Sequence, residues 1–577
     1  MTTKEFIEVF DTITEAPGGI DQLRELVLQL AVQGKLVPQD PNDEPASKLL
    51  KRIAAAKART SRKGRVKVRK VVDPALTRLN YHLPSGWASA HLSDLTQVLN
   101  GRAYKKSELL LEGTPVLRVG NLFTSNQWYY SDLDLDKDKY CEEGDLIYAW
   151  SASFGPFIWR GPKVIYHYHI WKLSLFSEID LRKQYLYNVL LQKTQDIKNA
   201  GHGISMVHLT KEKMEQLVVP LPPLAEQHRI VAKINELMGL IDRLENSRCS
   251  REAVRTAARN SALAALCNAA TPAEVEAAWT RIAEQVEDLF TTPDDLTPLR
   301  EAVLQLAVRG RLVPQDPGEE PAANLLRRAK TSKSREIIER KIRRNSEPEL
   351  SESAGEVSSP THWVWTHLYD FALVLGGKRL PAGASFSTEN TGNIYIRVTD
   401  MKDGSISTEN LQYISDDVRD RIAKYTIDRE DLYITIAGTI GDVGEVPRHF
   451  HGQNLTENAA KIVFREVDKK FLLLVLRSGD VQEQFQEKIK QMAQPKLALK
   501  RISGARVPIP PLAEQHRIVA KVNELMGLID QLEQHLSVSE KHNATFISAA
   551  VNYINTQDEK MLHQASDISF GASIVSK

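Results

Sequence analysis

The sequence predicts an α+β protein with two mixed α/β domains, joined by long antiparallel coiled-coil helices and related by a pseudo-twofold internal repeat. The first observation is that residues 222–245, PPLAEQHRIVAKINELMGLIDRLE, return at residues 510–533 with two positions changed. The second is that LRELVLQLAVQGKLVPQD, from Leu23, returns from Leu299 as LREAVLQLAVRGRLVPQD. The third is that the regions between these copies diverge. Self-similarity of this kind indicates a duplicated architecture.

The repeats divide the chain into constant frames and variable inserts. Near-identical frames around divergent inserts favour two surfaces of different specificity over two copies that have simply drifted apart. The six predicted parts are 1–82, an N-terminal helical frame and basic linker; 83–219, the first variable domain; 220–290, the central repeat with its long helix and a helical connector; 291–357, the second frame and linker; 358–507, the second variable domain; and 508–577, the C-terminal repeat, long helix and tail.

The helices of the frame have clear start and stop signals. Apolar residues at helical spacing predict an amphipathic helix over about 19–33, which Gly34 is placed to end. In the repeat, two prolines suit a first turn and Glu226 adds negative charge at the positive end of the helix dipole. A helix of roughly 25 residues would be about 37 Å long, close to one turn of B-DNA. Separate helices are predicted over about 251–268 and 272–289.

The long helices carry apolar residues at gaps of 4, 3, 4 and 3, the a/d spacing of a coiled-coil seam. The two seams could pair with each other in an antiparallel fashion. Alternatively, each could cover only the core of its own domain. The seam residues are Ile230, Ile234, Leu237, Ile241 and Leu244 in the first copy, and Ile518, Val522, Leu525, Ile529 and Leu532 in the second.

The variable domains read as mixed α/β, with short β-rich runs followed in the first by a helix over about 181–198. Although their sequences differ, their landmarks come in the same order. Pro84, Gly86 and Trp87 correspond to Pro360, His362 and Trp363, and GDLIYAWSASFG (144–155) corresponds to EDLYITIAGTIG (430–441). The two domains are therefore expected to share one fold.

Composition gives no global argument for a nucleic-acid partner, because 75 Lys and Arg nearly cancel 74 Asp and Glu. Locally, residues 51–70 hold ten basic residues and no acidic one, which could contact phosphates or form a solvated linker. Residues 327–344 are also basic, but Glu336 and Glu339 favour a solvent-facing helix. Three scattered cysteines fit a reducing cytoplasm. No signal-peptide core or run of about 18 apolar residues occurs, so neither export nor membrane insertion is expected.

Catalytic signatures are missing from the sequence. It has no G-x-x-x-x-G-K-[ST], H-E-x-x-H or G-x-S-x-G motif, and no Asn-Pro-Pro-aromatic tetrapeptide of the kind that amino-methylating enzymes use. His167 and His169 could ligate a metal, but the alternating Tyr166, Tyr168 and Ile170 favour ordinary strand packing. We therefore predict a non-catalytic recognition protein with no metal site.

Two variable domains, each opening with a Pro-x-x-Trp-like segment and closing with P-[LI]-P-P-L-A-E-Q-x-R-I-V and a heptad helix, resemble the DNA-specificity subunit of type I restriction-modification enzymes. The resemblance extends from about Leu23 to His535. It implies defence against foreign DNA, with each variable domain a target-recognition domain that reads half of a bipartite site in double-stranded DNA and the helices setting the unread spacer. It also implies two methyltransferase subunits that bind S-adenosylmethionine and two restriction and translocase subunits that use ATP and Mg. This chain would bind neither cofactor.

The resemblance directs attention to basic and amide side chains in the loops of the inserts. Arg and Lys suit guanine or phosphate, whereas Asn and Gln suit adenine; any of them could instead be a solvated surface residue. The candidate DNA-binding residues are Arg102, Tyr104, Lys105, Lys106, Arg118, Asn121, His202, Ser205 and His208 in the first domain, and Lys378, Arg379, Arg397, Thr399, Gln494 and Lys496 in the second.

Two other functions are consistent with part of the sequence. One is an enzyme, either a fused restriction and methylation polypeptide or a stand-alone nuclease, which the missing tetrapeptide and the fully occupied chain length disfavour. The other is a non-catalytic scaffold whose duplicated domains bind protein partners. Salt-dependent, sequence-selective binding to duplex DNA would distinguish recognition of DNA from a pure scaffold.

Overall fold

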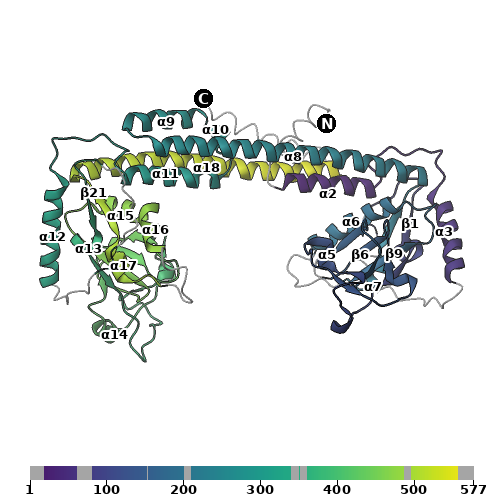
Figure 1. The fold of residues 1–577 in the computed structure, drawn as a ribbon, viewed down its shortest axis with the longest axis horizontal. Coiled ribbons are helices and arrows are strands. Elements are labelled where there is room, and N and C mark those ends of the chain that lie inside the picture. The colour runs from purple at the N-terminus through teal and green to yellow at the C-terminus, as the bar shows by residue number, and fades with distance from the viewer. Residues whose placement is uncertain are drawn as a thin grey trace. The chain divides into compact units, whose positions relative to one another are not determined.

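The computed structural model describes residues 18–61, 79, 81–151, 154–200, 209–339, 348, 350, 360–486 and 496–556 (Figure 1). The chain forms two compact units. Unit 1 comprises Met1–Arg251 with Lys541–Lys577, and unit 2 comprises Glu252–Glu540. Each unit contains one frame, one variable domain and part of both long helices, α8 (Leu224–Asn268) and α18 (Leu512–Thr556).

Unit 1 begins with two frame helices and continues into a mixed domain. Its elements are α2 (Gly19–Val32), α3 (Ala46–Ser61), β1 (Ala88–His91), α4 (Leu92–Leu95), β2 (Thr96–Asn100), η1 (Lys106–Glu108), β3 (Thr114–Leu117), α5 (Val119–Phe123), β4 (Tyr129–Ser131), η2 (Lys137–Lys139), β5 (Tyr140–Cys141), β6 (Leu146–Ala149), β7 (Gly155–Ile158), β8 (Val164–Tyr166), β9 (Ile170–Leu175), α6 (Lys183–Ala200), α7 (Lys211–Gln216) and β10 (Val218–Leu221). The bounds of α2 confirm the predicted frame helix.

Unit 2 begins with a helical connector and continues into two frame helices and a second mixed domain. Its elements are α9 (Pro272–Glu284), α10 (Val286–Leu289), η3 (Pro293–Leu296), α11 (Thr297–Val308), α12 (Ala322–Glu339), β11 (Val364–His367), α13 (Leu368–Phe371), β12 (Leu373–Gly376), β13 (Tyr395–Ile396), η4 (Val398–Asp400), β14 (Met401–Lys402), β15 (Ser405–Ile406), α14 (Asp416–Arg421), β16 (Thr426–Ile427), β17 (Leu432–Thr435), β18 (Val443–Glu445), η5 (Arg448–Phe450), β19 (Gln453–Leu455), β20 (Ala459–Val463), α15 (Lys469–Arg477), α16 (Gly479–Gln486), α17 (Leu499–Gly504) and β21 (Arg506–Ile509).

The main antiparallel sheets of the two domains have the same order. In the first, an antiparallel sheet runs β2-β9-β6-β7; in the second, the corresponding sheet runs β12-β20-β17-β18. A second sheet contains one parallel pair in each domain, β3 with β8 and β13 with β19. The strand that opens each domain pairs with the strand that closes it, β1 with β10 and β11 with β21. The shared fold that the landmarks predict is therefore confirmed.

Each long helix is longer than its pattern predicts. Both α8 and α18 contain 45 residues, which is about 68 Å at 1.5 Å per residue. The prediction that one helix ends near 245 and another starts near 251 is wrong, because residues 246–250 (NSRCS) contain no Pro or Gly and the helix continues through them. The expected match between the helix length and one turn of B-DNA therefore does not hold for these 45-residue helices. The predicted helix over 272–289 is instead broken at Gln285.

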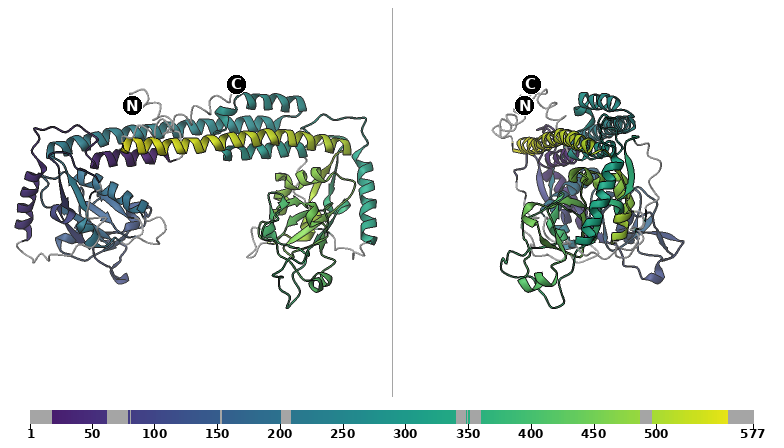
Figure 2. Two further views of the ribbon diagram at one scale, coloured as in Figure 1. Left: turned by 180° about the vertical axis from the view of Figure 1, so that it is seen from behind. Right: turned by 90° about the vertical axis from the view of Figure 1, so that its left-hand side faces the viewer.

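The predicted seam packs against the frame helix of the same unit. In unit 1, Ile230, Ile234 and Ile241 share a core with residues of α2. In unit 2, the equivalent seam shares a core with α11 and with Leu263 and Leu266 near the end of α8. These last turns of α8 lie beside the first turns of α18 and run in the opposite direction (Figures 1 and 2). Within each unit the seam packs on its own frame helix, and in unit 2 the seam of α18 also packs against α8, so the two alternatives that the sequence leaves open do not exclude each other there.

Ion pairs fix the frame helices on the long helices. Arg24 of α2 binds Asp242 and Glu245 of α8 at 2.8 and 2.7 Å. At the equivalent place, Arg300 of α11 binds Asp530 and Glu533 of α18, both at 2.7 Å. Among the described residues, no helix is long and apolar enough to cross a membrane.

Candidate nucleic-acid interface

The repeated PPLAEQ segment attaches the first variable domain to its frame. Glu226, in the first turn of α8, is buried and accepts hydrogen bonds from Trp87 Nε1 (2.9 Å) and Gln39 Nε2 (3.1 Å). Burial raises the pKa of Glu226, against these two hydrogen bonds. The neighbouring Gln227 is fully buried and accepts the backbone N–H of Arg182, just before α6. Two adjacent side chains therefore hold the frame, the first segment of the domain and its main helix together.

The second PPLAEQ segment makes the same contacts. Glu514 accepts from Trp363 Nε1 (3.0 Å) and from Gln315 Nε2 (2.6 Å). Gln515 accepts the backbone N–H of Asp468, the N-cap of α15, at 2.8 Å. This explains why Trp87 and Trp363 recur at the start of each insert: each indole contacts the repeated glutamate.

A close contact with glycine fixes the entry into each domain. Gly34 has φ of 71°, and a Cβ there would lie 2.4 Å from Cγ of Pro84. Gly310 has φ of 69°, and a Cβ there would lie 2.5 Å from Cγ of Pro360. A residue with a side chain would meet both backbone strain and a clash at these positions.

In the first domain, a basic and aromatic cluster forms where three loops meet. The chain leaves β2 at Gly101, and Arg102 N–H donates to the carbonyl of Tyr166 at the end of β8. The carbonyl of Leu117, at the end of β3, accepts from His167 N–H. Arg102 and Arg118, both predicted as DNA-binding residues, are therefore brought to the two sides of one turn, 167–169.

Around this turn, aromatic rings contact one another and the two arginines. His167 lies 6.4 Å from the ring of Tyr104 and 4.4 Å from that of Tyr168, between ring centroids. Trp150 is in edge contact with His169 at 5.0 Å. Burial lowers the pKa of His167 to about 4, with the nearby His169 and Arg118 acting in the same direction. The imidazole of His167 is therefore neutral at physiological pH.

Arg102 is held in place by an acidic side chain. Its guanidinium makes two hydrogen bonds to Glu108, at 3.0 and 2.8 Å, and lies over the ring of Tyr104 at 5.2 Å. The hydrogen bonds from Arg102 lower the pKa of Glu108 to about 2. Lys105 and Lys106 on the same loop are exposed and form no ion pair with any described residue. Because Arg102 and Glu108 neutralise each other, these two lysines give the loop a net positive charge.

Arg118 lies over the ring of Tyr129 at 4.2 Å, and its buried Nε has no hydrogen-bond partner. The amide of Asn121, a predicted DNA-binding residue, is used within its own loop. Its Oδ1 accepts from Arg118 N–H at 3.1 Å, and its Nδ2 donates to the carbonyls of Ser125 and Gln127. The amide that suited adenine thus caps a local turn.

The second domain builds the same arrangement with other residues. Lys378 N–H donates to the carbonyl of Leu455, as Arg102 N–H does to Tyr166. Thr456 N–H donates to the carbonyl of Ile396, as His167 N–H does to Leu117. Turn 456–458 therefore corresponds to turn 167–169, and Lys378 corresponds to Arg102.

Arg397 corresponds to Arg118. Its backbone N–H donates to Asp400 Oδ2 at 2.7 Å, and its guanidinium binds the buried carboxylate of Asp400 at 2.7 Å. Arg379 is highly exposed and binds Glu457 at 2.9 Å. Lys496 donates to the carbonyl of Glu457 at 3.3 Å, whereas Thr399 is exposed on η4. Five of the six candidates in this domain are described. Arg379 and Lys496 contact Glu457 in the turn, Lys378 contacts Leu455 just before it, and Arg397 follows Ile396, which accepts from the turn.

Four predicted residues, His202, Ser205, His208 and Gln494, lie outside the described residues. Residues that are not among the predicted DNA-binding ones also lie in the two clusters: Trp150, Tyr168 and His169 in the first, and Glu457 and Asn458 in the second. The YHYHI run predicts a strand, but the backbone turns at residues 167–169 and leaves Tyr168 40% exposed. Among the described residues, no group of three potential metal ligands occurs.

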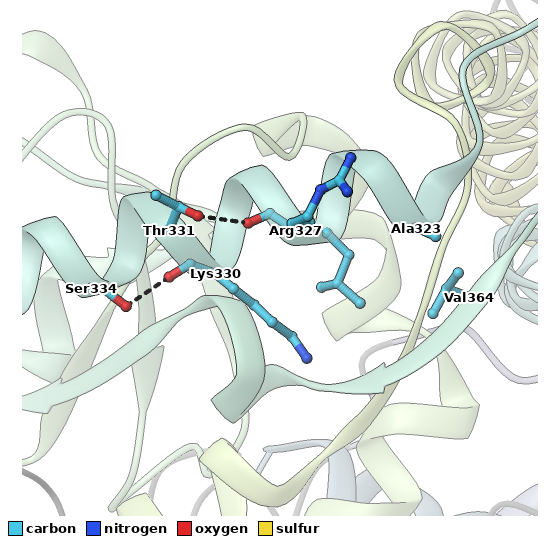
Figure 3. A pocket seen from close by; sticks show the side chains of 7 residues that line it. Ala323, Arg327, Lys330, Thr331, Ser334 and Val364 are labelled. Carbon is cyan, nitrogen blue, oxygen red and sulfur yellow. Dashed lines mark hydrogen bonds between the residues drawn. The ribbon is translucent and has the colours of Figure 1, made fainter.

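The frame also has a basic surface on α12. A pocket of about 380 Å³ lies against this helix and is lined by Arg327, Lys330, Thr331 and Ser334 (Figure 3). The two hydroxyls donate to backbone carbonyls one turn earlier, and Lys330 pairs with Asp370 at 3.4 Å. The polar groups of this pocket are thus engaged within the protein.

A family model described as type I restriction modification DNA specificity domain matches residues 84–249 and, a second time, residues 360–538. The chain belongs to this family of specificity subunits. It is 27% identical to the specificity subunit of the type I restriction enzyme EcoAI of Escherichia coli, over 91% of this chain and 92% of that protein. It is 26% identical to the EcoEI specificity subunit of Escherichia coli, with the same coverage. Among solved structures, the HsdS subunit from Thermoanaerobacter tengcongensis is 16% identical, with a TM-score of 0.39 over 82% of this chain and 98% of that chain.

Both family matches in this specificity subunit begin at the proline that contacts a frame glycine, Pro84 or Pro360, and both end inside a long helix. The matched unit is thus one variable domain together with the start of the helix to which PPLAEQ attaches it.

Proposed function

We propose that this chain is the DNA-binding specificity subunit of a type I restriction-modification complex, in which each variable domain reads one half of a bipartite target. One observation carries the proposal: the two domains share backbone hydrogen bonds around turns 167–169 and 456–458 but carry different side chains there. Sequence is read by side chains on base edges, whereas phosphate contacts fix position. A common scaffold with different side chains suits two readers of different half-sites.

The arginines and lysines beside each turn suit contact with DNA. Arg102 and Arg118 in the first domain, and Lys378 and Arg397 in the second, flank the turn on corresponding loops. Lys105, Lys106 and Thr399 add exposed donors nearby. We propose that these residues, with the candidates His202, Ser205, His208 and Gln494, contact phosphates or bases.

We further propose that the long helices form an antiparallel coiled-coil spacer and relate the two domains by a pseudo-twofold axis. The proposal is supported by the equal lengths of α8 and α18 and by their identical starts. Because a helix has a fixed rise per residue, its length would set the unread gap between half-sites.

The chain would also be a scaffold for a partner present in two copies. Leu240 of α8 and Leu528 of α18 occupy the same position of the repeat and are 39% and 48% exposed. The exposed Asn235 and Glu236 also recur as Asn523 and Glu524. Folding does not require identity at exposed positions, whereas binding the same partner twice does. We propose that two methyltransferase subunits bind here, and that two restriction subunits complete the enzyme.

In this scheme the chain itself is not catalytic and binds no cofactor. S-adenosylmethionine would be bound by the methyltransferase subunits, and ATP with Mg by the restriction subunits. The division of labour is supported by the missing catalytic motifs in the sequence.

Binding and methylation assays with and without the partner test this function. The complex of this chain with its methyltransferase subunit should bind one duplex selectively, with affinity that falls steeply with salt. The chain alone should transfer no methyl group. Methylation by the isolated chain would instead indicate an enzyme, and absence of selective DNA binding by the assembled complex would favour a protein-binding scaffold.

A further inference from the structure

Turns 167–169 and 456–458 are each approached closely by a glycine at the end of a strand. In the first domain, a Cβ on Gly101 would lie 2.2 Å from the carbonyl oxygen of His167. In the second, a Cβ on Gly377 would lie 2.1 Å from the carbonyl oxygen of Thr456. Glycine is thus required at both positions for the strand end to approach the turn. The same close approach fixes both turns.

Equivalent backbone hydrogen bonds hold the turn of each domain. Gly101 N–H donates to the carbonyl of Ile170 at 3.2 Å, and Gly377 N–H donates to that of Ala459 at 3.0 Å. Each turn also donates one N–H to the end of the parallel strand beside it, from His167 or Thr456. A side chain on such a turn is positioned by rigid elements, as a specificity contact requires.

The side chains on the turns are chemically different. Residues 167–169 are His, Tyr and His, whereas residues 456–458 are Thr, Glu and Asn. Tyr168 is 40% exposed, in edge contact with Trp150 at 6.2 Å. Glu457, at the corresponding position, is an acceptor that Arg379 and the hydroxyl of Tyr395 hold at 2.9 and 3.2 Å.

Asn458 provides the clearest recognition group. Its backbone N–H donates to Thr456 Oγ1 at 3.4 Å, but its side-chain amide forms no hydrogen bond with the described part of the chain. The side chain is partly exposed. An Asn amide can bond in a bidentate manner to adenine, and a Glu carboxylate can accept from cytosine N4. By contrast, the amide of Asn121 is fully used in a cap.

We propose that turns 167–169 and 456–458 are the specificity-determining elements of the two domains, with Tyr168, Glu457 and Asn458 contacting base edges of duplex DNA. The flanking Arg118 and Arg397 position the DNA. The inference rests on the proposed function. It adds residues that determine which base pairs are preferred, as distinct from those that determine how tightly any DNA binds.

The test uses the assembled complex of the full chain with its methyltransferase subunit. Binding is measured to the target duplex and to a panel in which each base pair is changed in turn. The variants are Glu457→Gln and Asn458→Ala in the second domain and Tyr168→Ala in the first. Matched controls are Glu409→Gln and Ile179→Ala, which change exposed residues of the same domains away from the turns.

We expect Asn458→Ala to reduce discrimination at one base pair of one half-site from roughly tenfold or more to within about threefold, with the other half-site unchanged. Tyr168→Ala should act only on the opposite half-site. The controls should leave every ratio unchanged. Unchanged ratios in the turn variants, or a uniform loss of affinity for all duplexes, would overturn the inference. If the unaltered complex prefers no duplex, it is the proposed function that fails.

Discussion

The indole Nε1 of Trp363 donates a 3.0 Å hydrogen bond to the buried carboxylate of Glu514, and Trp87 makes the same bond to Glu226 at 2.9 Å. Each bond joins the first segment of a variable domain to the first turn of a long helix. The insert can therefore vary in sequence while its attachment remains constant.

Replacing Glu514 by alanine should destabilise the second domain. The change leaves Trp363 Nε1 buried without an acceptor, which costs about 1–3 kcal/mol. The control is Glu524→Ala, which removes only an exposed ion pair with Lys521 on the same helix and should cost less than about 0.5 kcal/mol. Urea unfolding of the three proteins provides the comparison. Equal midpoints for Glu514→Ala and Glu524→Ala would contradict the role of this contact.

Placing a charge on the repeated exposed leucine should remove one partner at a time. Leu240→Asp or Leu528→Asp alone should reduce the number of bound methyltransferase subunits from two to one, and the double variant should bind none. Val254→Asp is the control, since Val254 is 70% exposed on α8 but lies outside the repeat. Native mass spectrometry of the complexes gives the stoichiometry. Two bound subunits in the double variant would exclude this surface.

Shortening α8 should shorten the unread gap. Deleting residues 246–252 removes seven residues, which keeps the helix faces nearly in phase and shortens the helix by about 10.5 Å. At 3.4 Å per base pair, the gap should shrink by about 3 base pairs while both half-sites stay the same. The methylated motif of the variant gives both quantities. Changed half-sites around an unchanged gap would contradict a spacer role.

His167 should make the first domain less stable in mild acid. Its pKa is about 4 in the folded turn, against about 6.5 in an unfolded chain. Between these values the unfolded chain binds a proton that the folded turn does not, so stability falls as pH decreases from about 6.5 to 4. His167→Gln should reduce this dependence. An NMR titration that assigns His167 a midpoint near 6.5 would show that burial does not act as described.

Local signals in the sequence predict the frame well because they are strong and short-range. The amphipathic pattern around Leu23, the stop at Gly34 and the two prolines before Leu224 give helix starts and ends that the structure confirms. The end of α8 could not be predicted in this way. Residues 246–250 are polar but contain no helix breaker, and polarity alone does not end a helix.

The candidate interface was harder to predict because one residue type serves two purposes. Asn121 suits adenine and also suits a cap, and only the structure shows that its amide is used locally. The sequence does not indicate that Tyr168 lies in the interface, because the alternating residues around it predict a strand, whereas the backbone turns after Tyr166. Which side chains surround a turn depends on contacts distant in sequence, such as Gly101 with His167.

Recognition of a bipartite target is tested most directly by single-molecule sequencing of DNA from cells that express this chain with its methyltransferase subunit, compared with cells that express the methyltransferase alone. If this chain reads a bipartite target, methylated adenines should appear in one motif of two short half-sites around a fixed unread gap, and only when this chain is present. No new methylation from a soluble, assembled complex, or a motif with a single continuous site, would contradict it.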